Sequence, residues 1–175
     1  NEYADICWGN GNFIDYAVLY QKRYAVLKKA FFRFIVSPEK NYNTFKKENS
    51  FWLGDYALFM AIKNANDGKS WNEWDDSLRF REKNAIAEAE KLYAEDVEFF
   101  KFLQYAFEKQ WLGLKKYANE NGVKIIGDIP IYVSYDSADV WCNPSQFDLN
   151  KELLPKMVAG CPPDEFSEKG QLWGN

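Results

Sequence analysis

The 175-residue chain contains no histidine. This absence excludes Ser-His-Asp and Cys-His mechanisms within the chain, because both need an imidazole as the general base. It also excludes zinc sites of the Cys₂His₂ and HExxH types. The three cysteines, Cys7, Cys142 and Cys161, are an odd number spread along the chain, which argues against a disulfide framework. A reducing compartment, and therefore a cytoplasmic location, is expected.

The sequence also lacks long apolar runs and an excess of basic residues. No stretch reaches the roughly 18 apolar residues of a membrane span. Lys and Arg total 22 against 26 Asp and Glu, for a net charge of −4. Because phosphate binding needs a basic face, neither a nucleic acid nor an acidic membrane is expected as a partner.

Aromatic residues are abundant: 18% of the chain, with 7 Trp, 11 Tyr and 14 Phe. With imidazole chemistry excluded, the remaining classes are carboxylate chemistry and binding by aromatic side chains.

The chain up to Asn121 has the apolar periodicity of helices. Asp15 is a plausible N-cap of a first helix, which Ser37-Pro38 ends. Ser70 and Glu73 have capping-box spacing before a short helix. Further helices are expected over 51–64, 81–92 and 94–119, the last of them ended by Asn121-Gly122.

Most aromatic residues in these helices are expected to belong to a core. Tyr24, Phe31 and Phe34 fall at helical spacing in the first helix, and Trp71 and Trp74 are interpreted as packing anchors. The longest helix has an expected core side at Val97, Phe100, Leu103, Phe107, Trp111, Leu114 and Ala118.

The pattern changes at Gly122. The β-branched run 123–126 predicts a buried strand, and Gly127-Asp128 would stand at its end, before a long irregular loop. This order is typical of an α/β barrel unit, in which ligand groups lie at the strand ends. The chain is therefore expected to have two parts: a mainly helical part, 1–121, and a barrel strand with site loops, 122–175.

Two stretches of the second part carry candidate site residues. In the first, Asp128 would project from the strand end, and Asp136 and Asp139 precede Trp141. Carboxylates beside aromatic rings are typical of sugar sites, because they accept hydroxyl hydrogen bonds while the ring covers the apolar sugar face. The alternative is structural: Asp136 and Asp139 cap a short helix and Trp141 is core.

The second stretch is 158–175, where Pro162-Pro163 presents Asp164 and Phe166, with Gln171 and Trp173 following. The alternative interpretation is simply a long polar loop.

Both stretches, GDIPIYVSYDSADVWCNP at 127–144 and VAGCPPDEFSEKGQLWGN at 158–175, strongly resemble the 4-α-glucanotransferases, the amylomaltases or disproportionating enzymes. The upstream segments 15–34 and 51–63 resemble the same family in the same order. The resemblance therefore spans essentially the whole chain.

This resemblance implies the α/β class: part of an amylase-like (β/α)₈ barrel, dominated in this chain by a helical insertion and so mainly α. It implies transfer of α-1,4-glucan segments to glucose or maltodextrin acceptors with retention, by two carboxylates about 5 Å apart. No cofactor or metal is expected.

By position in the family motifs, Asp136, Asp164, Phe166, Gln171 and Trp173 would contact substrate, and Asp128 would support the site. In this chain Glu165 stands directly before Phe166, where the family usually has an aromatic residue.

The catalytic carboxylates of the family are expected C-terminal to Asn175. The chain is therefore interpreted as an internal fragment, inactive alone and able to self-associate through unpartnered barrel surfaces. Two alternatives stay open: a non-catalytic glucan-binding or scaffold domain, and an amylase-like hydrolase.

Overall fold

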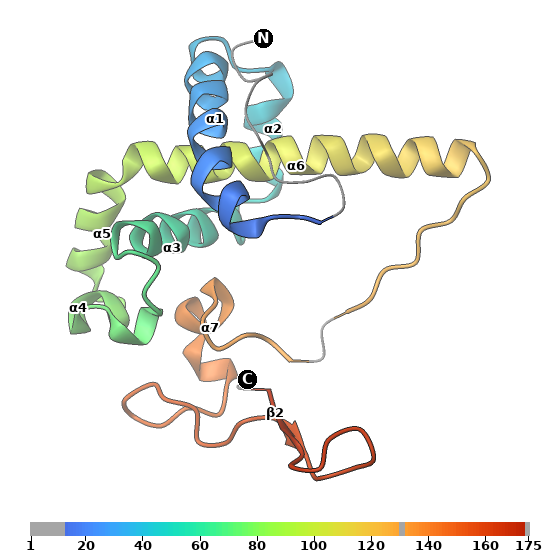
Figure 1. Ribbon diagram of the computed structural model, residues 1–175. Coiled ribbons are helices and arrows are strands. Elements are labelled where there is room, and N and C mark those ends of the chain that lie inside the picture. The colour runs from blue at the N-terminus through green and yellow to red at the C-terminus, as the bar shows by residue number, and fades with distance from the viewer. Residues whose placement is uncertain (1–12, 130–131, 174–175) are drawn as a thin grey trace.

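The protein is mainly helical (Figure 1), as the sequence predicts. The structure, a computed structural model, describes residues 13–129 and 132–173, so Cys7 lies outside the described residues. The α-helices are α1 (Tyr16–Val36), α2 (Lys40–Glu48), α3 (Leu53–Ala65), α4 (Asp76–Arg79), α5 (Lys83–Leu92), α6 (Ala94–Glu120) and α7 (Ala138–Cys142). Two 3₁₀ turns, η1 (Trp71–Glu73) and η2 (Pro144–Gln146), and two short strands, β1 (Gly160–Cys161) and β2 (Gln171–Leu172), complete the order.

The termini of the long helices follow the signals in the sequence. Asp15 caps α1, its carboxylate accepting a hydrogen bond from the backbone N–H of Val18 at 3.0 Å. At the other end of the helical part, Gly122 adopts a left-handed conformation with φ 76°. The N–H of Val123 then donates to the carbonyl of Ala118 at 2.9 Å, which closes the last turn of α6.

Two local features differ from the expectation. The sequence does not predict α2, whose Lys- and Asn-rich segment has little helical preference and only two buried side chains, Tyr42 and Phe45. Ser70 precedes a single 3₁₀ turn but makes no side-chain cap, so the predicted capping box is not formed. In both places tertiary packing of aromatic rings, rather than local sequence, decides the conformation.

A polar contact to α6 holds α2 in place. The Tyr42 hydroxyl and the Lys46 ammonium donate to one carboxylate oxygen of Glu98, at 2.9 and 2.7 Å. Partial burial acts to raise the pKa of Glu98, but the hydrogen bonds from Lys46 and Tyr42 outweigh it, and the pKa lies below its ordinary value. The ionised form of Glu98 is therefore stabilised by folding.

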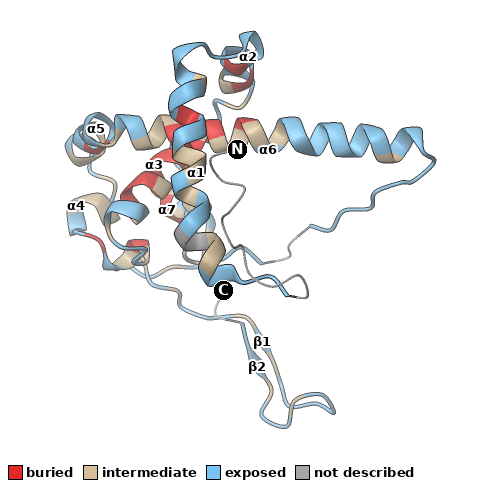
Figure 2. Ribbon diagram, turned by 45° about the horizontal axis from the view of Figure 1, so that its top comes forward, coloured by how far each residue is buried: buried red, intermediate tan, exposed pale blue. Residues whose placement is uncertain are grey.

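The core lies where α3 meets the first half of α6 and α7, with α1 packed against α6 (Figure 2). Its largest cluster consists of Leu58, Phe59, Ile62, Trp71, Trp74, Ala89, Val140 and Trp141. Trp71 and Trp74 are therefore packing anchors, as predicted. Phe31 is buried as expected, while Tyr24 and Phe34 are half-buried beside it.

The second half of α6 corrects the predicted core side of this helix. Phe107 and Leu114, expected in the core, are 64% and 55% exposed, and Trp111 is exposed as well. Phe100 is buried as predicted, and the other buried side chains of α6 are Phe99, Phe102 and Tyr105. The apolar stripe is real, but the helix runs beyond the elements that cover it, and Figure 2 shows the second half of α6 exposed.

The predicted buried strand over 123–126 is wrong for this structure. The segment is extended but belongs to no β-ladder, and Ile126 is 93% exposed. A β-branched run favours extended backbone, yet a strand also needs a neighbour to pair its N–H and C=O groups. Among the described residues the only ladder between strands is the antiparallel pair β1–β2, with Gly160 opposite Leu172 and Cys161 opposite Gln171.

Candidate functional site

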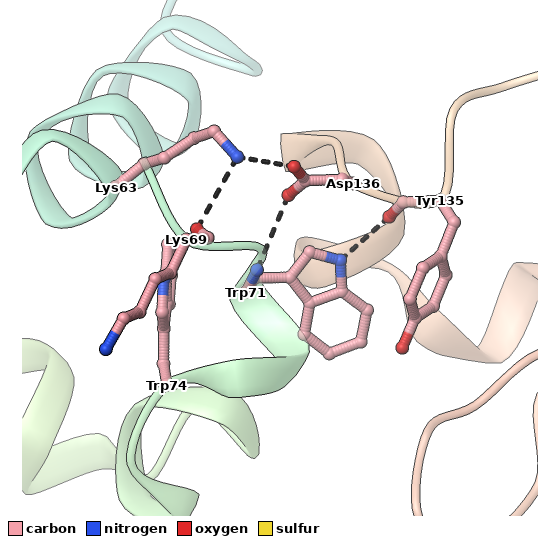
Figure 3. A network of polar contacts seen from close by, with 6 residues as sticks. All are labelled: Lys63, Lys69, Trp71, Trp74, Tyr135 and Asp136. Carbon is pink, nitrogen blue, oxygen red and sulfur yellow. Dashed lines mark hydrogen bonds and ion pairs between the residues drawn. The ribbon is translucent and has the colours of Figure 1, made fainter. Parts of the chain in front are cut away.

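The carboxylate of Asp136 is anchored to the helical part of the chain (Figure 3). One oxygen forms an ion pair with Lys63 on α3, and the other accepts the backbone N–H of Trp71 at 3.4 Å. The indole N–H of Trp71 in turn donates to the carbonyl of Tyr135 at 2.7 Å. The Asp136 side chain remains 34% exposed. These contacts tie residues 135–136 to α3 and η1.

The structural alternative for this stretch is confirmed for Trp141 and is wrong for Asp136 and Asp139. Trp141 is 1% exposed, and its indole N–H donates to the carbonyl of Leu78 at 3.0 Å. The cap of α7, however, is Ser137, whose hydroxyl accepts from the N–H of Val140, and Asp139 lies within the first turn. Asp136 and Asp139 therefore do not cap this helix.

Arg81 is a further anchor, which the sequence does not reveal. Its guanidinium lies 4.2 Å from the centre of the Trp141 ring and donates to Asp55 at 2.7 Å and to the Cys142 sulfur at 3.2 Å. The residue adopts a left-handed backbone with φ 54°, which is unusual for a side chain of this size. No local sequence signal predicts it, because all three partners are distant in sequence.

The thiol of Cys142 lies beside this guanidinium. Burial raises the pKa of Cys142 to about 12, although the positive charge of Arg81 acts in the opposite direction. Cys142 therefore stays protonated near neutral pH. Cys142 and Cys161 are both free thiols.

The loop between β1 and β2 is organised by Asp164. One oxygen of its carboxylate accepts the backbone N–H groups of Phe166 at 2.9 Å and Ser167 at 2.8 Å. This local turn holds the Phe166 ring outward, where it is 86% exposed. Gly170 has φ 70°, and a Cβ there would meet the carbonyl oxygen of Cys161 at 2.5 Å, so the return of the loop needs glycine.

Trp173 follows β2 and is held from two sides. Its indole N–H donates to the side-chain oxygen of Gln171 at 3.0 Å, and its ring lies 5.9 Å from the ring of Tyr132, at 44°. Both rings are about half exposed. The sequence did not single out Tyr132; its position in the stretch after Asp128 is the signal that could have found it.

The hydrogen bond that the Asp128 side chain makes is local. Asp128 lies in the exposed extended segment, where its carboxylate accepts the N–H of Ile129 at 2.8 Å. Its predicted place at the end of a strand is not realised, because no strand forms there.

The segment around the β1–β2 hairpin supplies hydrogen-bond acceptors, Asp164 and Gln171, and exposed rings, Phe166 and Trp173; of these four, Gln171 and Trp173 are joined by a side-chain hydrogen bond. This is the chemistry that sugars need, since rings cover the apolar sugar face and acceptors bind the hydroxyls. Within residues 13–129 and 132–173, no group of three or more metal-ligating side chains gathers. Nor does any described helix have the length and hydropathy to cross a membrane.

Comparison with known proteins identifies one family, and the match covers nearly the whole chain. The family model described as 4-alpha-glucanotransferase matches residues 2–175. The 4-alpha-glucanotransferase of Clostridium butyricum is 47% identical over 177 residues, which cover 100% of this chain and 36% of that protein. That of Thermus thermophilus is 48% identical over 166 residues, 93% of this chain and 33% of that protein.

A solved structure of an amylomaltase has the same fold over this part of its chain. The amylomaltase from Streptococcus agalactiae, determined in complex with acarbose, superposes with a TM-score of 0.94 at 42% identity, covering 99% of this chain and 36% of that chain. The chain thus spans about a third of the length of the relatives it matches. On the match over residues 2–175 and the identities of 47–48%, this chain belongs to the 4-alpha-glucanotransferase family.

Proposed function

We propose that the chain acts as part of a longer 4-alpha-glucanotransferase, which transfers α-1,4-glucan segments to glucose or maltodextrin acceptors. The observation that carries this proposal is the family match over residues 2–175. The similar fold of an amylomaltase bound to acarbose supports a glucan as the ligand. In that longer protein the chain contributes part of an amylase-like barrel.

The proposed reaction is a double displacement with retention. A carboxylate nucleophile displaces the leaving glucan and forms a glycosyl-enzyme intermediate, and the acceptor 4-hydroxyl then attacks it with the help of a second carboxylate as acid and base. These carboxylates are proposed to come from sequence outside the 175 residues, since the relatives are about three times longer. No cofactor is required by this chemistry.

This chain is proposed to supply glucan contacts. Phe166 and Trp173 would cover apolar sugar faces and keep water from the intermediate, while Gln171 and Asp164 accept hydroxyl hydrogen bonds. A carboxylate has about four acceptor positions, and the loop turn uses two of those of Asp164. Asp136, whose side chain is 34% exposed, is proposed as a further glucan contact.

Asp128 is proposed to support the site once the segment 122–129 is paired in the barrel. The division into a helical part, 1–121, and a barrel strand with site loops, 122–175, rests on the end of α6 at Glu120 and the extended chain after it. The free thiols Cys142 and Cys161 fit a cytoplasmic enzyme.

Self-association of the isolated 175-residue chain is also proposed. The exposed apolar side chains of the second half of α6, together with Ile126, supply an unpartnered surface. Sedimentation velocity over a range of concentrations tests it. A sedimentation coefficient that does not change with concentration and corresponds to a monomer would contradict the proposal.

Incubation with maltotriose tests the proposed activity. The full-length enzyme should release glucose and form longer maltodextrins, whereas the 175-residue chain alone should do neither. Glucose and maltose without longer products would instead identify a hydrolase. Binding of maltodextrin without any turnover by the full-length protein would identify a non-catalytic glucan-binding domain.

A further inference from the structure

Tyr132 is an aromatic residue of the candidate site for which the resemblance gives no role. Its ring is half exposed and lies 5.9 Å from the ring of Trp173, with the planes tilted by 44°. This separation and tilt belong to the favourable range for interacting aromatic pairs. Tyr132 follows the extended segment after α6 and Trp173 follows β2, so the contact joins two segments that are distant in sequence.

Tyr132 lies shortly before an anchored part of the chain. Three residues further on, the Tyr135 carbonyl accepts the indole N–H of Trp71 at 2.7 Å, and its hydroxyl donates to the carbonyl of Leu153 at 2.8 Å. Asp136 adds its ion pair with Lys63 (Figure 3). Trp71 is fully buried, so this end of the segment is fixed to the core.

The β1–β2 hairpin, which ends at Trp173, has much less support of its own. Each strand has two residues, Gly160–Cys161 and Gln171–Leu172, and no described residue of the hairpin is buried. So short a hairpin is marginally stable by itself. The orientation of the Trp173 indole therefore depends on side-chain contacts, namely the hydrogen bond to Gln171 and the ring of Tyr132.

We propose that Tyr132 is a positioning residue for glucan binding: its ring fixes the indole plane of Trp173, so that an α-glucan residue meets a preformed aromatic surface. The inference rests on the proposed glucanotransferase function. Fixing the ring before the sugar arrives lowers the entropy lost on binding. The nearest anchored residue in this segment is Tyr135, three residues after Tyr132, whose carbonyl accepts the indole N–H of the buried Trp71.

The test compares Tyr132→Ala and Tyr132→Phe in the full-length enzyme with maltotriose as substrate. Loss of the ring should raise KM about three- to tenfold, the range expected for one aromatic pair, with a smaller change in kcat. Phenylalanine keeps the ring, so Tyr132→Phe should restore KM to within about twofold of the wild type. Val133→Ala, next in the chain and also partly exposed, is the matched control and should leave both constants unchanged.

A double-mutant cycle separates positioning from a general structural effect. If Tyr132 acts through Trp173, Tyr132→Ala should have no further effect on KM in the Trp173→Ala background. Additive effects, an unchanged KM in Tyr132→Ala, or a phenylalanine variant as impaired as the alanine variant would each overturn the inference. Absence of transfer by the wild-type enzyme would instead defeat the proposed function, before any variant is compared.

Discussion

Removal of the Asp136 carboxylate, by Asp136→Ala, tests how residues 135–153 are held to the helical part of the chain. The substitution breaks the ion pair with Lys63 and leaves the backbone N–H of Trp71 without its acceptor. It also leaves the Lys63 ammonium, whose side chain is 22% exposed, without its countercharge.

The expected cost lies between the values for buried and for exposed pairs. Hydrogen bonds to charged groups contribute about 1.5–3 kcal/mol, and exposed ion pairs about 0–1 kcal/mol. The Lys63 and Asp136 side chains are 22% and 34% exposed, and the bond from Trp71 is long at 3.4 Å. We therefore expect Asp136→Ala to lower the free energy of unfolding by about 2 kcal/mol, or roughly 4–8 °C in Tm.

Asp148 provides the matched control. It pairs with Lys156 at 2.7 Å in the same half of the chain, but the two side chains are 60% and 54% exposed. Asp148→Ala should therefore lower the free energy of unfolding by less than about 1 kcal/mol, so that its loss in Tm is at most about half that of Asp136→Ala. Urea-induced and thermal unfolding of both variants, followed by circular dichroism, give the comparison.

The kinetic effect of Lys63→Met decides whether Asp136 also contacts glucan. If its role is only to hold the loop, Lys63→Met and Asp136→Asn should change KM for maltotriose equally in the full-length enzyme. A larger change in KM for Asp136→Asn would indicate direct contact. Equal losses of stability in Asp136→Ala and Asp148→Ala would refute the reasoning about burial.

Three further predictions concern other parts of the chain. Glu98→Gln should destabilise the protein near neutral pH but not in acid. Because the pKa of Glu98 in the folded state lies below 4.5, the stabilisation by its ionised form is complete above pH 4.5 and is lost as the pH falls through that folded pKa. Tm of both proteins, measured from about pH 7 to about pH 3, checks this. Gly170→Ala should disrupt the β1–β2 hairpin, whereas Gly113→Ala, with nothing within 4 Å of the new Cβ, should stabilise α6 by about 1 kcal/mol. Amide hydrogen exchange of the hairpin and of α6 measures the two effects. Equal effects of the two substitutions would contradict the strain expected for alanine at the φ of 70° of Gly170. Arg81→Met should lower the free energy of unfolding, measured by urea denaturation, by about 2 kcal/mol. Asp55→Ala should lower it by less, because Asp55 is half exposed and the contact of the Arg81 guanidinium with the Trp141 indole remains. A larger loss for Asp55→Ala would contradict the interpretation of Arg81 as an anchor.

The helices were predictable where the sequence carries local signals. Asp15, Ser37-Pro38 and Gly122 act within one turn of the residues they terminate, so periodicity and capping locate α1 and the end of α6 correctly. The helix α2 lacks such signals, because its stability comes from Tyr42 and Phe45 packing against other elements. Tertiary contacts of this kind cannot be deduced from periodicity.

Burial was predictable only where a partner is present. The same apolar stripe of α6 is buried at Phe100 and exposed at Phe107, two turns further along. Likewise, the run 123–126 has the composition of a strand but makes no ladder among the described residues. Periodicity tells which face is apolar, and the partner decides whether that face is buried.

The candidate site could be proposed from the sequence as a set of residue types, but the contacts of those residues could not be predicted. Asp164 and Trp173 are candidates from motifs, while the contacts of Arg81 and Tyr132 are with partners distant in sequence. Asp136 shows the difference most clearly, since a carboxylate predicted to bind sugar is found already paired with Lys63.

The contacts that fix residues 135–142 come from the helical part of the chain. Lys63 and Trp71 hold residues 135–136, and Arg81 covers Trp141, the residue around which α7 packs. Because these side chains stand on α3, on η1 and between α4 and α5, a change in the packing of the helices would move residues 135–142, which include the candidate contact Asp136. The helical part therefore does more than connect segments of the chain: it provides the fixed surface on which Asp136 and α7 are oriented.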